Sequence, residues 1–288
     1  MTEVEAAVGK TDPPADPLKT QLHKWLTSQG YPLELRTAQA FREIGHVRQS
    51  DYYYDSESAS HREIDVVVSM RSDTKSRTEW LDILLRIEAK SGADKPWVLF
   101  CGERTPSLHP VAQVVQRFAS PAARRWVSFA AHSHAVRALP LLTIEEHPGH
   151  SLIKANFSSN QGGSDVAYKA INSAVKAAHW ETTREDIYPG LNKISVIAFP
   201  VIAIDAPLFK CDIDETGALR LWRVDMGTLI WHNNVVPSAP PHTIVHVVTE
   251  AGIPEYARQA SETAHGLSMS YSRIRRRELA SQRKSEEE

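Results

Sequence analysis

Two acidic residues of this chain stand in strongly apolar surroundings, where a charge is costly. Asp65 lies between Ile64 and the run 66–68, which is all valine. Glu88 follows the apolar run 83–87, which only Arg86 interrupts. Burying an ionised carboxylate costs several kcal/mol unless the group is paired or binds a metal ion. Both positions are therefore candidates for a built site and not for ordinary surface polarity.

The spacing around Glu88 indicates which chemistry such a site would support. Alternate residues of a strand share one face, so Glu88 and Lys90 are expected to point the same way. If the two strands pair, Asp65 joins them at one end of the sheet. Carboxylates beside a few waters suit Mg²⁺, and Mn²⁺ could take its place. A bound metal eases deprotonation of water, and an ammonium can orient a phosphate. Together these groups suit phosphodiester hydrolysis.

The order of Asp65 and then Glu88-Ala89-Lys90 resembles the PD-(D/E)XK nuclease superfamily, which has the restriction-endonuclease-like fold. The resemblance covers residues 17–118 and departs from the pattern at Ile64, where the proline that names the motif is absent. It implies a central mixed sheet flanked by helices. It also implies magnesium-dependent cleavage of DNA, less often RNA, or an inactive relative that is used for binding.

The resemblance also assigns a role to each residue. Asp65 and Glu88 would bind the metal, with the backbone carbonyl of Ala89 as a further ligand. Lys90 would position the attacking water and stabilise the phosphate. A helix before the first strand carries another glutamate in this family, and Glu34 is the matching position, with Glu43 as second choice.

Each of these residues also has a purely structural interpretation. Asp65 could cap a neighbouring backbone, and Glu88 with Lys90 could form a surface ion pair. Glu34 could be an acid favoured by the positive end of a helix. Gln113 and Gln116 lie on a following helix, where some relatives place a polar residue near the metal, but solvated helix glutamines are the commoner case.

Basic side chains that could contact a nucleic acid occur in two places. Arg124 and Arg125 precede Trp126, and Arg275 and Arg276 belong to a C-terminal basic run. Either group could contact phosphates or could simply be solvated. The formal net charge is −2, so binding to a nucleic acid would depend on such local patches.

The composition limits the class of protein. In 288 residues, 42% are hydrophobic and 24% are charged, which excludes a disordered chain, a collagen-like repeat and a coiled-coil rod. Two cysteines are too few for a disulfide scaffold or a thiolate zinc site and suit a cytoplasmic protein. The pair His132 and His134 lacks further ligands nearby in sequence, so a surface loop is favoured over a zinc site. No membrane-spanning segment or secretory signal is expected.

The hydrophobic pattern predicts alternating helices and strands. Helices are expected at 17–30, 33–44, 110–127 with a break near Pro121, 164–180 and 253–267. Strands are expected at 46–56, 62–70, 80–92, 96–102, 150–157, 194–213, 218–233 and 242–250, and the segment 194–213 is either one long strand or a strand with a break at Pro200. This predicts a mixed α/β domain.

The predicted organisation has three parts. Residues 1–16 form a disordered tail and residues 271–288 a charged tail. Between them, residues 17–270 form one nuclease-like domain, with the motif region at 17–118 and an accessory second half at 119–270. The predicted function is that of a magnesium-dependent nuclease acting on DNA. The sequence leaves the oligomeric state open, and a homodimer is one of the options. The alternative is an inactive nuclease-fold module that binds nucleic acid or a protein.

Overall fold

The structure is a computed structural model that describes residues 16–27, 29–72, 80–92, 95–102, 109–115, 117–157, 164–184, 194–232 and 242–287. The helices are α1 (Pro17–Thr27), α2 (Tyr31–Phe41), α3 (Pro110–Val115), α4 (Pro121–Ala130), α5 (His134–Arg137), α6 (Ser164–Thr183) and α7 (Ile253–Glu287), with 3₁₀ turns at Pro140–Leu142 and Glu250–Gly252. The strands are β1 (His46–Asp55), β2 (Ser60–Arg71), β3 (Trp80–Lys90), β4 (Trp97–Cys101), β5 (Phe118–Ala119), β6 (Gly149–Lys154), β7 (Ile194–Ile204), β8 (Leu208–Ile213), β9 (Leu219–Val224), β10 (Met226–His232) and β11 (His242–Thr249).

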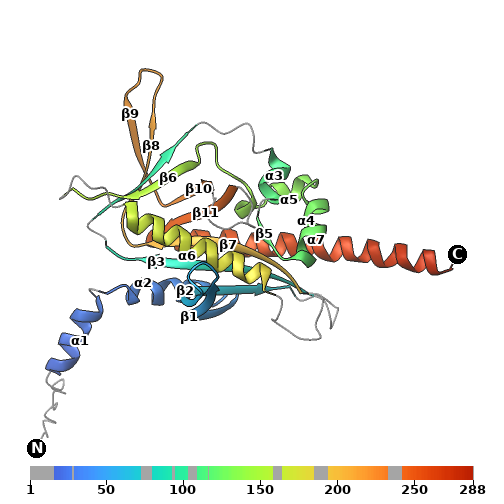
Figure 1. Cartoon of the computed structure of the whole chain (residues 1–288), viewed down its shortest axis with the longest axis horizontal. Helices are drawn as coiled ribbons and strands as arrows, with labels where there is room; N and C mark the ends of the chain where they lie inside the picture. Colours follow the sequence, from blue (N-terminus) through green and yellow to red (C-terminus); the bar gives the residue numbers. More distant parts are fainter. Residues whose placement is uncertain are drawn as a thin grey trace, which may run out of the picture.

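The strands form one mixed sheet, in the order β1-β2-β3-β7-β11-β10-β6-β4-β8-β9, with β5 paired to β7. β1, β2 and β3 are an antiparallel meander, and β3 continues in parallel to β7. Helices lie on both faces of this sheet (Figure 1). The predicted class, a mixed α/β fold with a large sheet flanked by helices, is confirmed.

The two faces of β3 are covered by different helices. Residues of α2, α4 and α7 pack with Val66, Val68, Leu85 and Ile87 on one face. Residues of α6 pack with Leu84 and the other side of β7 on the opposite face. A parallel strand that is covered on both sides reads as a continuous apolar run. This explains why all of β3 between its two terminal residues is buried.

The sequence interpretation of the second half needs three corrections. β7 is not broken at Pro200; the chain leaves the strand after Ile204. Pro200 falls between the residues of β7 that pair with β5 and those that pair with β11, so its missing N–H costs no ladder bond on that side. The division at residue 118 is no structural boundary, because β7 lies directly beside β3. The helix predicted at 110–127 is interrupted just before Pro121, as expected, but the interruption contains the short strand β5 between α3 and α4.

The two ends of the chain also differ from expectation. Asp16 caps α1 by accepting a hydrogen bond from the Leu18 N–H at 3.0 Å, and residues 1–15 lie outside the described residues. The apolar stripe of α1, however, is exposed, with 53% of Trp25 accessible. The charged segment 271–287 is not an irregular tail, because it continues α7 as one helix that extends beyond the sheet (Figure 1).

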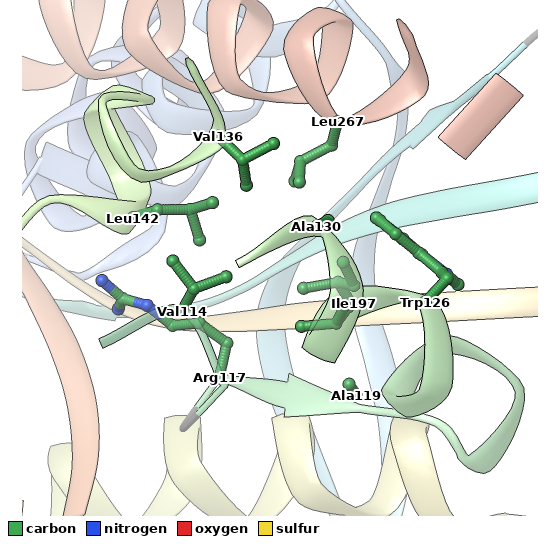
Figure 2. Close-up of a pocket in the computed structure, with 10 residues that line it drawn as sticks. Val114, Arg117, Ala119, Trp126, Ala130, Val136, Leu142, Ile197 and Leu267 are labelled. Carbon is green, nitrogen blue, oxygen red and sulfur yellow. The ribbon is translucent and has the colours of Figure 1, made fainter. Parts of the chain in front are cut away.

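A small cavity lies in the core beneath α7. Val114, Trp126, Val136 and Leu267 are among its lining residues, and its volume is about 10 Å³ (Figure 2). A space of this size holds about one water molecule, so the cavity is a packing defect and not a substrate site. Among the described residues, no helix is both long and apolar enough to cross a membrane.

Candidate active site at the ends of strands β2 and β3

The sheet brings Asp65 and Glu88 together. The β2–β3 ladder ends at the pair of Val66 with Ile87, so Asp65 and Glu88 are the next residues of their strands at this end. Glu88 points to the face covered by α6, where it contacts Ser173. Asp65 Oδ2 also accepts a hydrogen bond from the Ala89 N–H at 2.6 Å. The predicted convergence of these two carboxylates therefore follows from the strand register.

Glu88 is buried and has a partner for each of its oxygens. Its exposed fraction is 7%. Lys90 Nζ lies 2.5 Å from Oε1, and Ser173 Oγ of α6 lies 2.7 Å from Oε2. Glu88 and Lys90 thus share a face, as the alternation of the strand predicts.

The contacts that a purely structural role would predict for Asp65 and Glu88 are therefore present as well. Asp65 does cap the backbone of Ala89, and Glu88 does pair with Lys90. The pair is not on the surface, however, because the Glu88 side chain is 9% exposed and that of Lys90 is 29% exposed. A buried group of this kind gains little net stability from pairing. Burial therefore leaves a role in binding or chemistry open for these residues.

Glu34 lies at the margin of this group, in the first turn of α2. Burial, then the carboxylate of Glu63, raises the pKa of Glu34, and the charges of Lys90 and Glu88 also act on it. Gly30 makes room here, because a Cβ at this position would lie 3.2 Å from Ser91 Oγ and 3.5 Å from Glu34 Oε1. Glu43 is exposed and lies beyond the end of α2, so Glu34 is the better placed of the two glutamates.

The electrostatics of the site differ from those of an ordinary surface. Burial, then repulsion from Glu88, raises the pKa of Asp65 to about 7. Burial lowers the pKa of Lys90, but attraction to Glu88 and the hydrogen bond between them outweigh this, so the pKa stands above its ordinary value. Lys90 is consequently a cation at neutral pH that can donate hydrogen bonds but cannot act as a base.

The side chains do not form a finished metal cage. Among the described residues, no group of three or more His, Cys, Asp and Glu side chains is arranged to hold a metal ion. The predicted convergence of three carboxylate ligands is thus incomplete, since Lys90 and the Ala89 N–H occupy oxygens of Glu88 and Asp65.

The donor set nevertheless fits a hard divalent cation. Asp65, Glu88 and Glu34 supply carboxylate oxygens, and Lys90 is the cation that acts on all three. The raised pKa of Asp65 marks a carboxylate whose charge is not fully compensated. In a strand, the N–H and C=O of one residue point to the same neighbour. The Ala89 carbonyl is therefore directed toward β2, the side on which Asp65 lies.

The remaining sequence candidates lie elsewhere. Gln113 is 4% exposed and accepts a hydrogen bond from the Ile144 N–H, so it is not a solvated helix residue. Gln116 lies outside the described residues. His132 and His134 are exposed, as expected; His132 lies in a turn, whereas His134 begins α5.

The four candidate nucleic-acid contacts lie on two helices. Arg124 and Arg125 are exposed on α4, and Arg124 Nε donates to the Ala119 carbonyl at 3.0 Å. Arg276 is exposed on α7. Arg275 belongs to the same helix by its backbone, and its side chain lies outside the described part of the structure.

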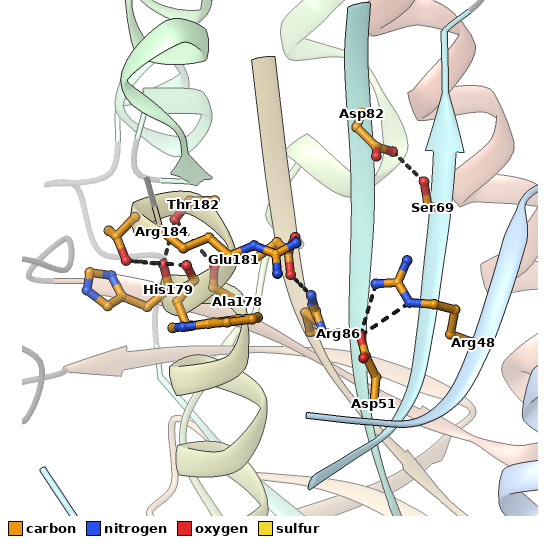
Figure 3. A network of polar contacts seen from close by, with 12 residues as sticks. Arg48, Asp51, Ser69, Asp82, Arg86, Ala178, His179, Glu181, Thr182 and Arg184 are labelled. Carbon is orange, nitrogen blue, oxygen red and sulfur yellow. Dashed lines mark hydrogen bonds and ion pairs between the residues drawn. The ribbon is translucent and has the colours of Figure 1, made fainter. Parts of the chain in front are cut away.

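Sequence reasoning missed the contribution of α6. Ser173 contacts Glu88, and Glu181 pairs with the buried Arg86 on the same face of β3 (Figure 3). Arg86 also bonds to Asp51 of β1 at 3.2 Å. A signal was present in the sequence, because Ser173 and Glu181 are polar residues within the otherwise alanine-rich helix. Which strand they face, however, could not be read from it.

The chain has no match among protein-family models, curated proteins or solved structures. The geometry of the site therefore stands without support from a relative.

Proposed function

We propose that this chain is a metal-dependent nuclease of the PD-(D/E)XK type that hydrolyses phosphodiester bonds of DNA. The observation that carries the proposal is the grouping of Asp65, Glu88 and Lys90 at the ends of two adjacent strands. Glu34, on the helix that precedes β1, lies close enough for its charge to act on Lys90. We base both the proposed restriction-endonuclease-like fold and the proposed chemistry on this combination of residues.

Each residue has a distinct role in the proposed reaction. Asp65 and Glu88 would hold Mg²⁺, or Mn²⁺ in its place. The Ala89 carbonyl would be a further ligand, and Glu34 would bind the metal directly or support its ligands. The bound ion would make water more acidic and offset charge on the phosphate. Lys90, which stays protonated, would donate hydrogen bonds to a phosphate oxygen or to the attacking water.

The alternative function is a binding module that has kept the fold without catalysis. One observation favours this alternative. Without a bound cation, the Ala89 N–H already bonds to the Asp65 carboxylate, and Lys90 already bonds to Glu88. In such a module, replacing Glu88 by glutamine would leave binding of nucleic acid or protein unchanged.

The experiment that tests the proposal compares cleavage by matched variants. Supercoiled plasmid, single-stranded DNA and RNA are incubated with the protein in Mg²⁺, Mn²⁺ or EDTA. Asp65→Asn, Glu88→Gln and Lys90→Ala are expected to lower cleavage by about 100-fold or more, since the first two remove the charge of a metal ligand and the third removes the cation beside the phosphate. Asp82→Asn is the control, because Asp82 is a buried carboxylate on the same strand that bonds to Ser69. Metal-dependent cleavage that survives Glu88→Gln would overturn the proposal.

A further inference from the structure

Glu88 is held from two sides by different elements. Oε1 contacts Lys90 Nζ, at the end of a long and flexible side chain of β3. Oε2 contacts the hydroxyl of Ser173, which α6 carries. An ionised carboxylate only accepts hydrogen bonds, so Ser173 must donate its single proton to Glu88.

The hydroxyl of Tyr53 extends this interaction. Tyr53 of β1 is hydrogen-bonded to Ser173, and 1% of the residue is exposed. Because Ser173 has already given its proton to Glu88, Tyr53 must be the donor in the second bond. Burial raises the pKa of the Tyr53 phenol, so it keeps this proton at neutral pH. Three residues from β1, α6 and β3 thus form one directed chain of hydrogen bonds.

The helix that carries Ser173 is fixed independently of the site. Lys176 Nζ contacts Asp55 at 3.1 Å, and Glu181 pairs with Arg86 on β3. Ala177 packs with Tyr53 and Ile64 in a small apolar cluster. These attachments, within the eight residues that follow Ser173 on α6, hold its hydroxyl in a fixed position. The Lys90 ammonium, in contrast, donates its hydrogen bond to the Glu88 carboxylate, the group it neutralises.

The two oxygens of Glu88 are therefore not equivalent. We propose that Ser173 and Tyr53 are positioning residues that hold Oε2, so that Glu88 offers only Oε1 to a divalent cation once Lys90 moves aside. This inference rests on the proposed function, because it concerns the same cation. It adds that Glu88 is a ligand through one oxygen, and that residues outside the recognised motif set its orientation.

Removal of a partner that orients a metal ligand typically costs 10- to 100-fold in metal affinity. Calorimetric titration of Mn²⁺ into the full chain measures this without any substrate. Ser173→Ala is expected to weaken binding by about 10-fold or more, and Ser173→Thr, which keeps the hydroxyl, is expected to restore most of it. Tyr53→Phe should give a smaller loss in the same direction, because it acts through Ser173.

The control is Thr183→Ala on the same helix. The Thr183 hydroxyl donates to the His179 carbonyl of its own helix at 2.9 Å, so its removal should leave the Mn²⁺ affinity unchanged. Cleavage by Ser173→Ala should also recover when Mn²⁺ is raised to saturation, since the variant lacks affinity and not a reacting group. Thermal melting in EDTA shows whether each variant is folded, and Tyr53→Phe gives a second reading if Ser173→Ala is not.

Two results would overturn the inference, and they differ in what else they remove. If the unmodified chain binds Mn²⁺ and both Ser173→Ala and Tyr53→Phe bind it equally well, the positioning role is wrong while the proposed nuclease stands. If the unmodified chain binds neither Mn²⁺ nor Mg²⁺, the proposed function fails together with this inference.

Discussion

Arg86 of β3 and Glu181 of α6 form an ion pair that is almost completely removed from solvent. Their side chains are 0% and 3% exposed, and Figure 3 shows the guanidinium directed between Glu181 and Asp51. The pair lies on the same face of β3 as Glu88, and it attaches α6 to the sheet next to the candidate site. Burial lowers the pKa of Arg86 to about 10, which still leaves it charged at neutral pH.

Breaking this ion pair from one side should be costly. Glu181→Leu leaves a buried guanidinium with Asp51 as its remaining carboxylate, and a loss of about 3 to 5 kcal/mol in the free energy of unfolding is expected. The double variant Arg86→Met/Glu181→Leu removes both charges and should recover much of that loss. Denaturant unfolding of the two single variants and the double variant measures the coupling. Additive losses would contradict the interpretation.

The ionisation of Asp65 should make the metal-free protein less stable as pH rises. Its pKa is about 7 in the folded chain, against an ordinary value of 3.8, so the folded state holds this proton more tightly than the unfolded state. The associated stability is present below about pH 4 and is lost as pH rises toward 7. Asp65→Asn should therefore melt like the unmodified chain near pH 4 in EDTA and above it near pH 8.

Asp51 provides the matched control with the opposite sign. Burial raises the pKa of Asp51, but the hydrogen bond and charge of Arg48, together with Arg86, outweigh this and hold the pKa below its ordinary value. Asp51→Asn should consequently lower the melting temperature at neutral pH, and the loss should shrink as pH falls. An equal response of both variants at every pH would show that the two carboxylates do not differ as described.

The element types and the central convergence were predictable from sequence because local pattern determines them. Apolar runs identified β2 and β3, and alternation placed Glu88 and Lys90 on one face, as observed. Antiparallel pairing of consecutive strands is the commonest arrangement, so the meeting of Asp65 with Glu88 required no distant information.

The contacts that could not be predicted are those between distant parts of the chain. β7 pairs with β3 across more than 100 residues, with Lys90 beside Ile204, and nothing near either strand specifies that partner. The position of α6 follows from this pairing, and with it the contact of Ser173 with Glu88. Likewise, a break at Pro200 remained one of two alternatives, because the sequence shows the missing N–H but not which neighbouring strand would have needed it.

Two glycines allow Leu99 to lie across neighbouring strands. A Cβ at Gly149 would lie 2.6 Å from one methyl of Leu99, and a Cβ at Gly227 would clash with the other. Leu99 is 0% exposed and has little freedom to move. Gly227→Ala should therefore cost about 1 to 3 kcal/mol of unfolding free energy.

The compensating change is Leu99→Val, which shortens the side chain. In that background Gly227→Ala should cost clearly less, so the two effects will not add. Gly102→Ala is the control, because its Cβ would meet His150 at an ordinary 3.6 Å. Denaturant unfolding measures the unmodified chain and the four variants, and an equal cost of Gly227→Ala in both backgrounds would contradict the proposed clash.

The continuation of α7 changes the expectation for the C-terminal arginines. On a helix, residues three and four apart are neighbours, whereas residues two apart face different directions. Arg276 and Arg277 therefore share a side with Arg273, and Arg275 lies on another side of α7. If this helix contacts a nucleic acid, the two sides must contribute differently. From the sequence alone, Arg275 and Arg276 were equivalent candidates for contacts with phosphates.

Binding to a labelled DNA duplex in EDTA at several salt concentrations tests this difference. Each phosphate contact contributes about 0.9 to the slope of log K against log salt. The double variant Arg273→Gln/Arg276→Gln should reduce the slope by up to about twice that value, whereas Arg275→Gln should change it little. Arg258→Gln is the control on the same helix, because Glu255 and Glu262 already neutralise Arg258. Slopes that are equal in all variants would mean that α7 is solvated and that phosphate contacts, if any, lie elsewhere, with Arg125 on α4 as the next residue to replace.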